Sequence, residues 1–217
     1  MVSQLNPETM SHPEDTANRI MRAALETVRD VGIKGTSARA IAAKGGFNQA
    51  LIFYHFGSVT NLLIEAARNS SAERVTAYRS LTAEVASLVE LVEIATRLHD
   101  DSAKDGSVAV LTQLMAGAAS DPAMGKAILE GFEGWIGLVE EGLSQALEGE
   151  PLAGVVPARE AAYAISALFL GIELMTRLDP EKSEADAVFA ALGELAELMG
   201  SMPGLVTRYL KGRGRQA

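Results

Sequence analysis

The sequence predicts an all-α protein of about nine helices, and three observations support this prediction. Apolar residues recur at intervals of three and four positions through most of the 217-residue chain. Strand-like alternation of apolar and polar residues is scarce, and leucine, alanine, glutamate and valine dominate the composition. Hydrophobic residues make up 48% of the chain, which is ample for a core.

The first helix is expected to begin between Ser11 and Thr16 and to end near Gly32. Ser11 and Glu14 have the spacing of a capping box. Residues 1–12 are polar, and we expect them to be disordered. Apolar residues then recur on one helical face, at Ile20, Ala24, Val28 and Val31.

A second, short helix is expected in "TSARAIAAKGG". Thr36 or Ser37 would cap its start, and Gly45 or Gly46 would end it. The alanines on this helix would let a neighbouring helix approach closely.

A third helix is expected in "FNQALIFYHF", where rings are concentrated although aromatic residues make up only 5% of the chain. Asn48 would cap it, and Phe47 would pack on Ile52. Ile52 and Phe56, four positions apart, would share its inward face. Two short helices joined by a three-residue glycine-containing turn form the helix-turn-helix pattern, whose second helix enters the DNA major groove.

Six longer helices are expected after "GS" at residues 57–58. Short runs rich in glycine, proline and aspartate separate them. Their expected ranges are 59–81, 84–99, 107–119, 122–147, 157–178 and 184–199.

Several classes of protein are excluded by composition. The chain has no cysteine, which rules out disulfides and thiolate metal sites and fits a cytoplasmic location. His12, His55 and His99 lie far apart in sequence, so we expect no metal site, and nothing indicates a cofactor. The N-terminus lacks the pattern of a signal peptide, and the most apolar run, residues 161–171, is about half a membrane span.

The net charge of −9 is unevenly distributed. Residues 1–60 hold six basic and five acidic residues, whereas the rest of the chain holds 13 basic and 23 acidic residues. The N-terminal part can therefore approach a polyanion without a large repulsive field of its own.

The segment 16–63, which contains "TSARAIAAKGGFNQALIFYHFGS", resembles the DNA-binding domain of TetR-type transcriptional repressors. The resemblance covers about 48 residues at many fixed spacings; beyond it, only helix count and order match. It implies a helix-turn-helix domain at residues 1–62 and a ligand-binding and dimerisation domain at residues 63–217.

The resemblance also implies the DNA contacts. Gln49 and Ala50 would face base edges, where a glutamine can pair with adenine and an alanine methyl can touch thymine. Tyr54 and His55 would clamp phosphates, which sets register without selecting sequence. The expected contact residues are Ser37, Arg39, Asn48, Gln49, Ala50, Leu51, Phe53, Tyr54 and His55.

Two positions depart from the family pattern. Phe53 replaces a usual tyrosine and Val59 a usual lysine, so one hydroxyl and one cation are lost. We expect the slope of log affinity against log salt to fall by roughly one unit per lost cation. Two plainer interpretations stay open: an ordinary helical hairpin for residues 45–56, and a buried histidine for His55.

Ligand contacts are expected in the C-terminal part. In "ILEGFEGWIGLVEEGL", three glycines at a spacing of three leave room for a cavity, walled by Phe132 and Trp135. The more ordinary interpretation is close helix packing around a core tryptophan. Methionines suit adaptable pockets but also fill ordinary cores, and His99 suits the end of a helix. The candidates are His99, Met115, Phe132, Trp135 and Met175.

The helices expected at 157–178 and 184–199 are apolar over wide faces, which requires cover on both sides. The resemblance implies that they form a four-helix bundle between two subunits. Two recognition helices about 34–36 Å apart can then contact both halves of a palindrome.

The sequence therefore indicates a non-enzymatic, homodimeric regulator, most simply a repressor of palindromic operator DNA released by a small apolar or amphipathic ligand. One alternative is an all-α enzyme with a vestigial helix-turn-helix, although no nucleophile–base pair or phosphate loop is evident. Another is a regulator of the same fold that is controlled by a protein and binds no ligand.

Overall fold

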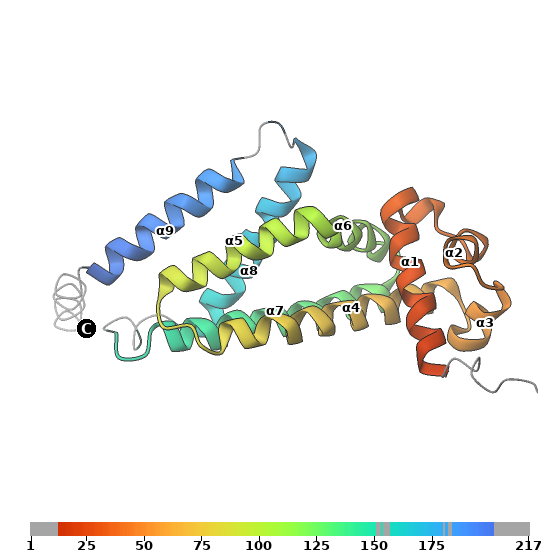
Figure 1. The fold of residues 1–217 in the computed structure, drawn as a ribbon, viewed down its shortest axis with the longest axis horizontal. Coiled ribbons are helices and arrows are strands. Elements are labelled where there is room, and N and C mark those ends of the chain that lie inside the picture. Colours follow the sequence, from red (N-terminus) through yellow and green to blue (C-terminus); the bar gives the residue numbers. More distant parts are fainter. Residues whose placement is uncertain (1–12, 151–152, 154–156, 180, 182–183, 202–217) are drawn as a thin grey trace, which may run out of the picture. The chain divides into compact units, whose positions relative to one another are not determined.

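The structure is a computed structural model that describes residues 13–150, 153, 157–179, 181 and 184–201. These residues form nine helices and no strand, which confirms the predicted all-α fold (Figure 1). The helices are α1 (Pro13–Gly35), α2 (Ala38–Gly45), α3 (Ala50–Phe56), α4 (Val59–Thr82), α5 (Leu88–Asp105), α6 (Ser107–Ala118), α7 (Pro122–Ala146), α8 (Ala158–Leu178) and α9 (Ala185–Ser201).

The chain packs as two compact units. The first consists of Met1–Asn69 together with Gln113–Ile128, and the second of Ser70–Thr112 together with Leu129–Ala217. The sequence predicts a DNA-binding domain at residues 1–62 and a ligand-binding and dimerisation domain at residues 63–217. These functional assignments stay predictions. The expected disorder of residues 1–12 and the capping role of Ser11 concern residues outside the described part of the chain.

The core of the first unit comes from the apolar faces of α1 to α4. Side chains of these four helices are completely buried, at Ile20, Ala24, Val28, Ile41, Ile52 and Leu62. Helix α1 bends at Gly32, whose φ of 72° is the left-handed conformation that glycine adopts readily. Val31, which was expected to face inward, is exposed, because the regular helix ends one residue later.

The turn between α2 and α3 is closed by two glycines with different roles. Gly46 has a φ of 64° and caps α2, and the N–H of Phe47 donates to the carbonyl of Ala42 at 3.1 Å. Gly45 is required for space, since a Cβ there would lie 2.2 Å from Cε1 of Phe47 and 2.9 Å from Cβ of Ala23. The ring of Phe47 therefore occupies the space that a side chain at position 45 would need.

Helix α5 differs from its expected range of 84–99. It begins at Leu88, where the Ser87 hydroxyl accepts the N–H of Glu90 at 3.2 Å and the Glu90 carboxylate accepts the N–H of Ala86 at 2.8 Å. It continues to Asp105 and stops at Gly106, whose φ is 69°. The polar run that suggested a loop is helical, because only Gly106 interrupts the backbone hydrogen bonds.

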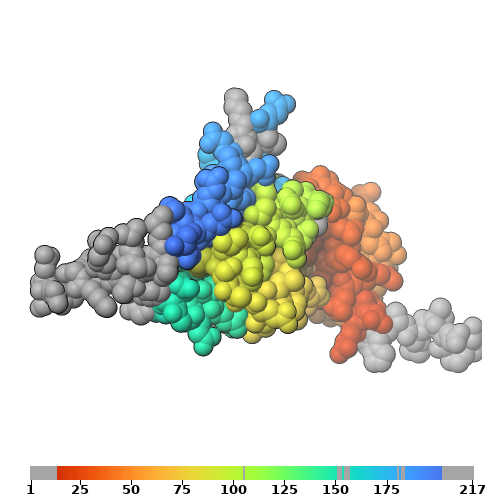
Figure 2. Space-filling model, turned by 60° about the vertical axis from the view of Figure 1, so that its left-hand side comes forward, coloured from red at the N-terminus to blue at the C-terminus, as the bar shows by residue number. Residues whose placement is uncertain are grey.

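In the second unit, α5 packs against α9, and α9 lies on the surface (Figure 2). Helix α8 has an unusual distribution of side chains. Its buried residues include Ser166 and Glu173, whereas Phe169, Leu170 and Ile172 are only half-buried. Its other large apolar side chains are exposed, at Tyr163, Ile165, Leu168, Leu174, Met175 and Leu178.

Helix α8 is also long and apolar enough to cross a membrane by length and composition. Its most apolar 18-residue window has a mean hydropathy of 1.4, and 17% of that window is buried. The sequence-based expectation of no membrane span rested on residues 161–171 alone, and it stays a prediction. An exposed apolar surface of this extent requires cover by a partner or a lipid phase.

Replacing Gly45 with alanine tests the tight turn. The added methyl collides with Phe47 and Ala23, so we expect Gly45→Ala to lower the free energy of unfolding by about 1–3 kcal/mol, as overpacking does. Gly125→Ala, in the same unit, is the control: its Cβ would meet only Ala118 at 3.9–4.0 Å. Urea unfolding should show little loss or a gain for Gly125→Ala; equal losses for both variants would contradict the steric argument.

Candidate nucleic-acid interface

Helix α3 is positioned by one buried side chain and by its N-terminal turn. Ile52 is 0% exposed, which fixes the helix on the first unit. The side-chain oxygen of Asn48 accepts the N–H of Ala50 at 2.9 Å. Asn48 was predicted as the N-cap, but the helix starts at Ala50, so Gln49 occupies the cap position and makes no side-chain cap bond. The amide of Gln49 is therefore not used at the helix start.

The opposite face of α3 is exposed. Tyr54 is 82% exposed and Phe53 is 51% exposed. Gln49 and Ala50 are also exposed, whereas Leu51 is half-buried. A short helix that is anchored by one isoleucine and presents polar and aromatic side chains outward has the form of a recognition helix.

The end of α3 carries stacked rings. The ring centroid of His55 lies 5.1 Å from that of Tyr54, edge to face, and 6.1 Å from that of Phe56. Phe56 was expected to be inward and is half-buried, as is His55. The carbonyl of Phe56 accepts the side-chain amide of Asn61 at 3.1 Å, which ties α3 to α4.

Helix α2 contributes Ser37 and Arg39. The Ser37 hydroxyl caps the helix by accepting the N–H of Ala40 at 3.2 Å, and its residue is exposed. Arg39 is exposed, and in the described part of the chain no carboxylate pairs with it. Val59, where the family usually has a lysine, is half-buried at the start of α4.

Two other cations of the first unit are engaged by Asp30. The ammonium of Lys44 lies 2.6 Å from Oδ2 of Asp30, and Nε of Arg29 lies 3.5 Å from Oδ1. The hydrogen bond from Lys44 is the main cause that lowers the pKa of the Asp30 carboxyl below its ordinary value of 3.8. Sequence reasoning missed this pair because its members are 14 positions apart on different helices.

The five candidate ligand contacts are divided between the two units. Met115 is exposed and belongs to the first unit, whereas the other four belong to the second. Met175 is 66% exposed on α8. Phe132 and Trp135 are half-buried on α7, and the Trp135 ring contacts that of Tyr78 at 5.9 Å.

His99 is buried and bonded. Its Nδ1 lies 2.5 Å from Oε1 of Glu173, which is also buried, and its ring contacts Phe189 at 5.3 Å. The suggestion that His99 merely ends a helix is wrong, because α5 continues to Asp105. The partner on α8 is 74 positions away, so no local sequence signal predicts it.

Of the three α7 glycines at a spacing of three, two favour close packing and one leaves space. A Cβ at Gly131 would lie 2.9 Å from Oγ of Ser71, and that hydroxyl donates to the Gly131 carbonyl at 3.2 Å. A Cβ at Gly134 would lie 3.4 Å from Val75, whereas none of the described atoms lies within 4 Å of a Cβ at Gly137.

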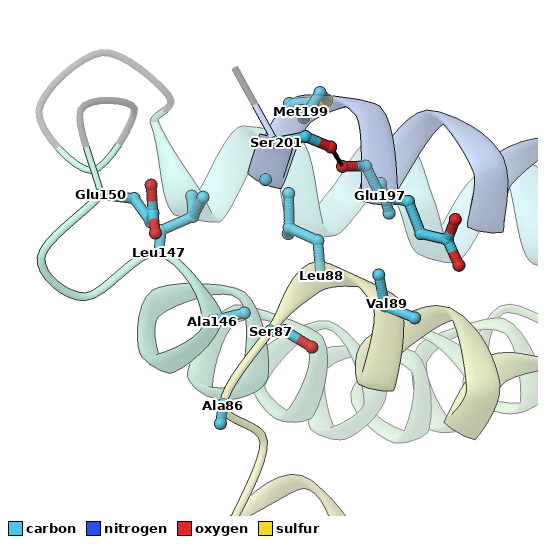
Figure 3. A pocket seen from close by; sticks show the side chains of 12 residues that line it. Ala86, Ser87, Leu88, Val89, Ala146, Leu147, Glu150, Glu197, Met199 and Ser201 are labelled. Atoms are coloured by element: carbon cyan, nitrogen blue, oxygen red, sulfur yellow. Dashed lines mark hydrogen bonds between the residues drawn. The ribbon is translucent and has the colours of Figure 1, made fainter. Parts of the chain in front are cut away.

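A cavity of about 470 Å³ lies in the second unit, between the start of α5 and the ends of α7 and α9. Figure 3 shows Leu88 pointing from α5 toward α9. The lining residues, none of which is a predicted ligand contact, are Ala86, Ser87, Leu88, Val89, Ala146, Leu147, Glu150, Ala196, Glu197, Met199, Gly200 and Ser201. No group of three or more potential metal ligands occurs among the residues the structure describes.

Helix α3 is anchored by the buried Ile52, exposes its outer face and follows a glycine turn. This arrangement is that of a helix-turn-helix DNA-binding protein. Residues 20–66 match the family model of the bacterial regulatory proteins of the tetR family. Over these residues the chain therefore carries the DNA-binding domain of the TetR family of transcriptional regulators.

Known proteins similar to the chain agree with this assignment. The HTH-type transcriptional regulator Rv2912c of Mycobacterium tuberculosis is 24% identical over 108 residues, which cover 50% of this chain and 55% of that protein. The chain thus spans about half the length of the curated relatives it matches. Two solved structures share its fold: a TetR-family regulator from Mesorhizobium loti (TM-score 0.72, 18% identity, 88% and 98% coverage of the two chains) and FadR from Bacillus subtilis in complex with stearoyl-CoA (0.68, 18%, 82% and 96%).

The pair between Asp30 and Lys44 predicts a pH dependence of stability. Because the folded-state pKa of Asp30 is depressed, its stabilising contribution is complete above the ordinary pKa and is lost as pH falls through the folded value. We expect wild type to unfold at a higher temperature than Asp30→Asn at pH 6, and this difference should shrink as the pH falls below 3.8. Lys44→Met should remove the same dependence; an unchanged difference at low pH would contradict the assignment.

Proposed function

We propose that the chain is a homodimeric repressor that binds palindromic operator DNA and is released by a small amphipathic ligand. The observation that carries the DNA-binding part is the division of α3 into a buried Ile52 and an exposed outer face. Gln49 and Ala50 contact base edges, with Leu51 and Phe53 providing apolar contacts to them. Ser37, Arg39, Asn48, Tyr54 and His55 contact the backbone and set the register of the helix in the groove.

The proposed subunit interface is formed by α8 and α9. Helix α9 also exposes apolar side chains, those of Leu195 and Leu198, in addition to those of α8. An apolar surface of this kind on a chain of this family supports burial against a second copy. In an isologous dimer, the same two helices of each copy bury the apolar side chains of the other copy. Such a dimer places two recognition helices on one duplex.

A membrane-spanning role for α8 is disfavoured by its polar contacts. Glu173 is buried against His99 of α5. Arg159, near the start of α8, donates to Glu133 and, at 3.3 Å, to Glu140 of α7. Insertion of α8 into a bilayer would break these contacts and place Glu173 in hydrocarbon.

The ligand is proposed to bind inside the second unit, where α8 presents a polar stripe. Ser166, Glu173 and Arg177, seven and four positions apart, share one face of the helix. The Ser166 residue is only 7% exposed, and its hydroxyl has no hydrogen-bond partner in the described part of the chain. Buried polar atoms without partners are costly, which supports a polar ligand group here. The candidates His99, Phe132, Trp135 and Met175 belong to the same unit.

An amphipathic ligand also fits what is known of one relative. FadR of Bacillus subtilis was solved in complex with stearoyl-CoA, a molecule with a long apolar chain and a polar head. In our proposal the ligand favours a dimer in which the recognition helices no longer fit successive grooves. The shift is limited by the difference between the ligand affinities of the two states.

Substitutions on α3 test the DNA-binding proposal. We expect Tyr54→Ala to weaken binding to a selected operator duplex about tenfold, because a phosphate hydrogen bond is lost. Gln49→Ala should reduce discrimination at one base pair by about 1–3 kcal/mol. Arg97→Ala, an exposed arginine on α5, is the control. Fluorescence anisotropy measures the affinities; no specific binding by wild type would overturn the proposal.

A charge on the outer face of α8 tests the dimer. Leu168 is exposed on α8, so Leu168→Glu should leave the fold intact but place two carboxylates in the proposed interface. Sedimentation velocity should show dimers for wild type and monomers for the variant. Leu129→Glu, which changes another exposed leucine, on α7, should stay dimeric; a monomeric wild type would refute the interface.

Ser166→Ala tests the ligand site. Without ligand, removal of an unpartnered buried hydroxyl should raise the free energy of unfolding by about 1 kcal/mol. With stearoyl-CoA as the probe, the variant should show a smaller release of operator DNA than wild type. Stabilisation without any change in ligand response would place the ligand elsewhere, and no response by wild type would favour a regulator without this ligand class.

A further inference from the structure

Arg19 of α1 lies over the turn that precedes the recognition helix. Its guanidinium carbon lies 5.7 Å from the centroid of the Phe47 ring, within the range of a cation–π contact. Phe47 is followed directly by Asn48, whose side-chain oxygen accepts the N–H of Ala50 at the start of α3. The contact therefore places a cation of α1 next to the end of α3 that carries Gln49 and Ala50.

The ring beneath Arg19 is held in place by the backbone. The N–H of Phe47 is bonded to the carbonyl of Ala42, and the ring lies over Gly45, where even a methyl group would collide with it. Because Gly45 has no side chain, the Phe47 ring can occupy the space above it. The ring surface that Arg19 contacts is therefore already in place before DNA binds.

Unlike Lys44 and Arg29, Arg19 has no acidic partner among the described residues. Lys44 and Arg29 both lie within 4 Å of the carboxylate of Asp30. Arg19 is exposed, and in the part of the chain that the structure describes no carboxylate lies within ion-pair distance of it. Its positive charge is thus available to an anion from outside the protein.

We propose that Arg19 binds a backbone phosphate of the DNA and that Phe47 is the positioning residue that holds its guanidinium for this contact. The inference rests on the proposed DNA-binding function and adds a contact on α1 that the helix-turn-helix pattern does not identify. The Arg19 contact would partly replace the phosphate contact that is lost because Val59 stands where the family usually has a lysine.

The contact with the Phe47 ring suits this role. None of the described residues accepts a hydrogen bond from the Arg19 guanidinium, so its N–H groups remain available to a phosphate. These donors can bind two oxygens of one phosphate, which is a strong and directional contact. Holding the side chain in advance also reduces the rotamer entropy that is lost on binding.

The experiment uses the full chain and a duplex selected by wild type from a random-sequence pool. Affinity is measured by fluorescence anisotropy at several potassium chloride concentrations. We expect Arg19→Ala to weaken binding about tenfold and to lower the slope of log affinity against log salt by about one unit per bound subunit. The loss should be equal on duplexes with single base-pair changes, because a phosphate contact carries no sequence information.

Two further variants separate positioning from folding. Phe47→Leu keeps an apolar side chain but removes the ring face, so it should weaken binding less than Arg19→Ala. In the Phe47→Leu background, adding Arg19→Ala should cost under threefold, because the guanidinium is no longer held. Arg29→Ala, on the same helix but paired with Asp30, is the matched control and should leave the slope unchanged.

Each outcome is decisive. An unchanged affinity and slope for Arg19→Ala overturns the inference while leaving the proposed function intact. Weaker binding with an unchanged slope and a lowered unfolding temperature assigns Arg19 a purely structural role and also overturns it. Absence of specific DNA binding by wild type overturns the proposed function and this inference together.

Discussion

The burial of Ile52 is the interaction on which the DNA-facing surface depends. Helix α3 has seven residues, too few to be stable in isolation, so its position is determined by its packing. Ile52 supplies the anchor, and glycines with positive φ at positions 46 and 57 let the chain turn sharply before and after it. Because these constraints act on one face and at both ends, the outer face is free to carry side chains chosen for DNA.

Helix α8 follows a different rule from an ordinary surface helix. Such a helix turns its apolar stripe inward, whereas α8 buries Ser166 and Glu173 and exposes Leu168 and Met175. The apolar side chains of the outward face need an apolar partner to be buried, and the polar side chains of the inward face need hydrogen-bond partners. His99 satisfies Glu173, but nothing in the described chain satisfies the hydroxyl of Ser166. One helix thus carries both the proposed subunit interface and a polar face toward the interior.

Local patterns predicted the fold and the DNA-facing helix well. Caps, glycines and apolar spacing identified α2 and α3, and Ser37 caps as expected, because these features act within a few residues. The boundaries of α5 were wrong, since a polar run is helical when no glycine or proline interrupts it. The buried pair of His99 and Glu173 and the pair of Asp30 and Lys44 were not predicted, because partners on different helices meet only through tertiary packing.

The bend at Gly32 brings the end of α1 against a distant stretch of sequence. The N–H of Ile33 donates to the side-chain carbonyl of Gln113 at 3.5 Å, and a Cβ at Gly117 would lie 2.9 Å from Cδ1 of Ile33. The DNA-facing module is therefore discontinuous along the chain. A chimera that borrowed only its first seventy or so residues would leave Ile33 without this cover. Transplanting the specificity of this protein into another regulator requires carrying residues 113–128 along with it.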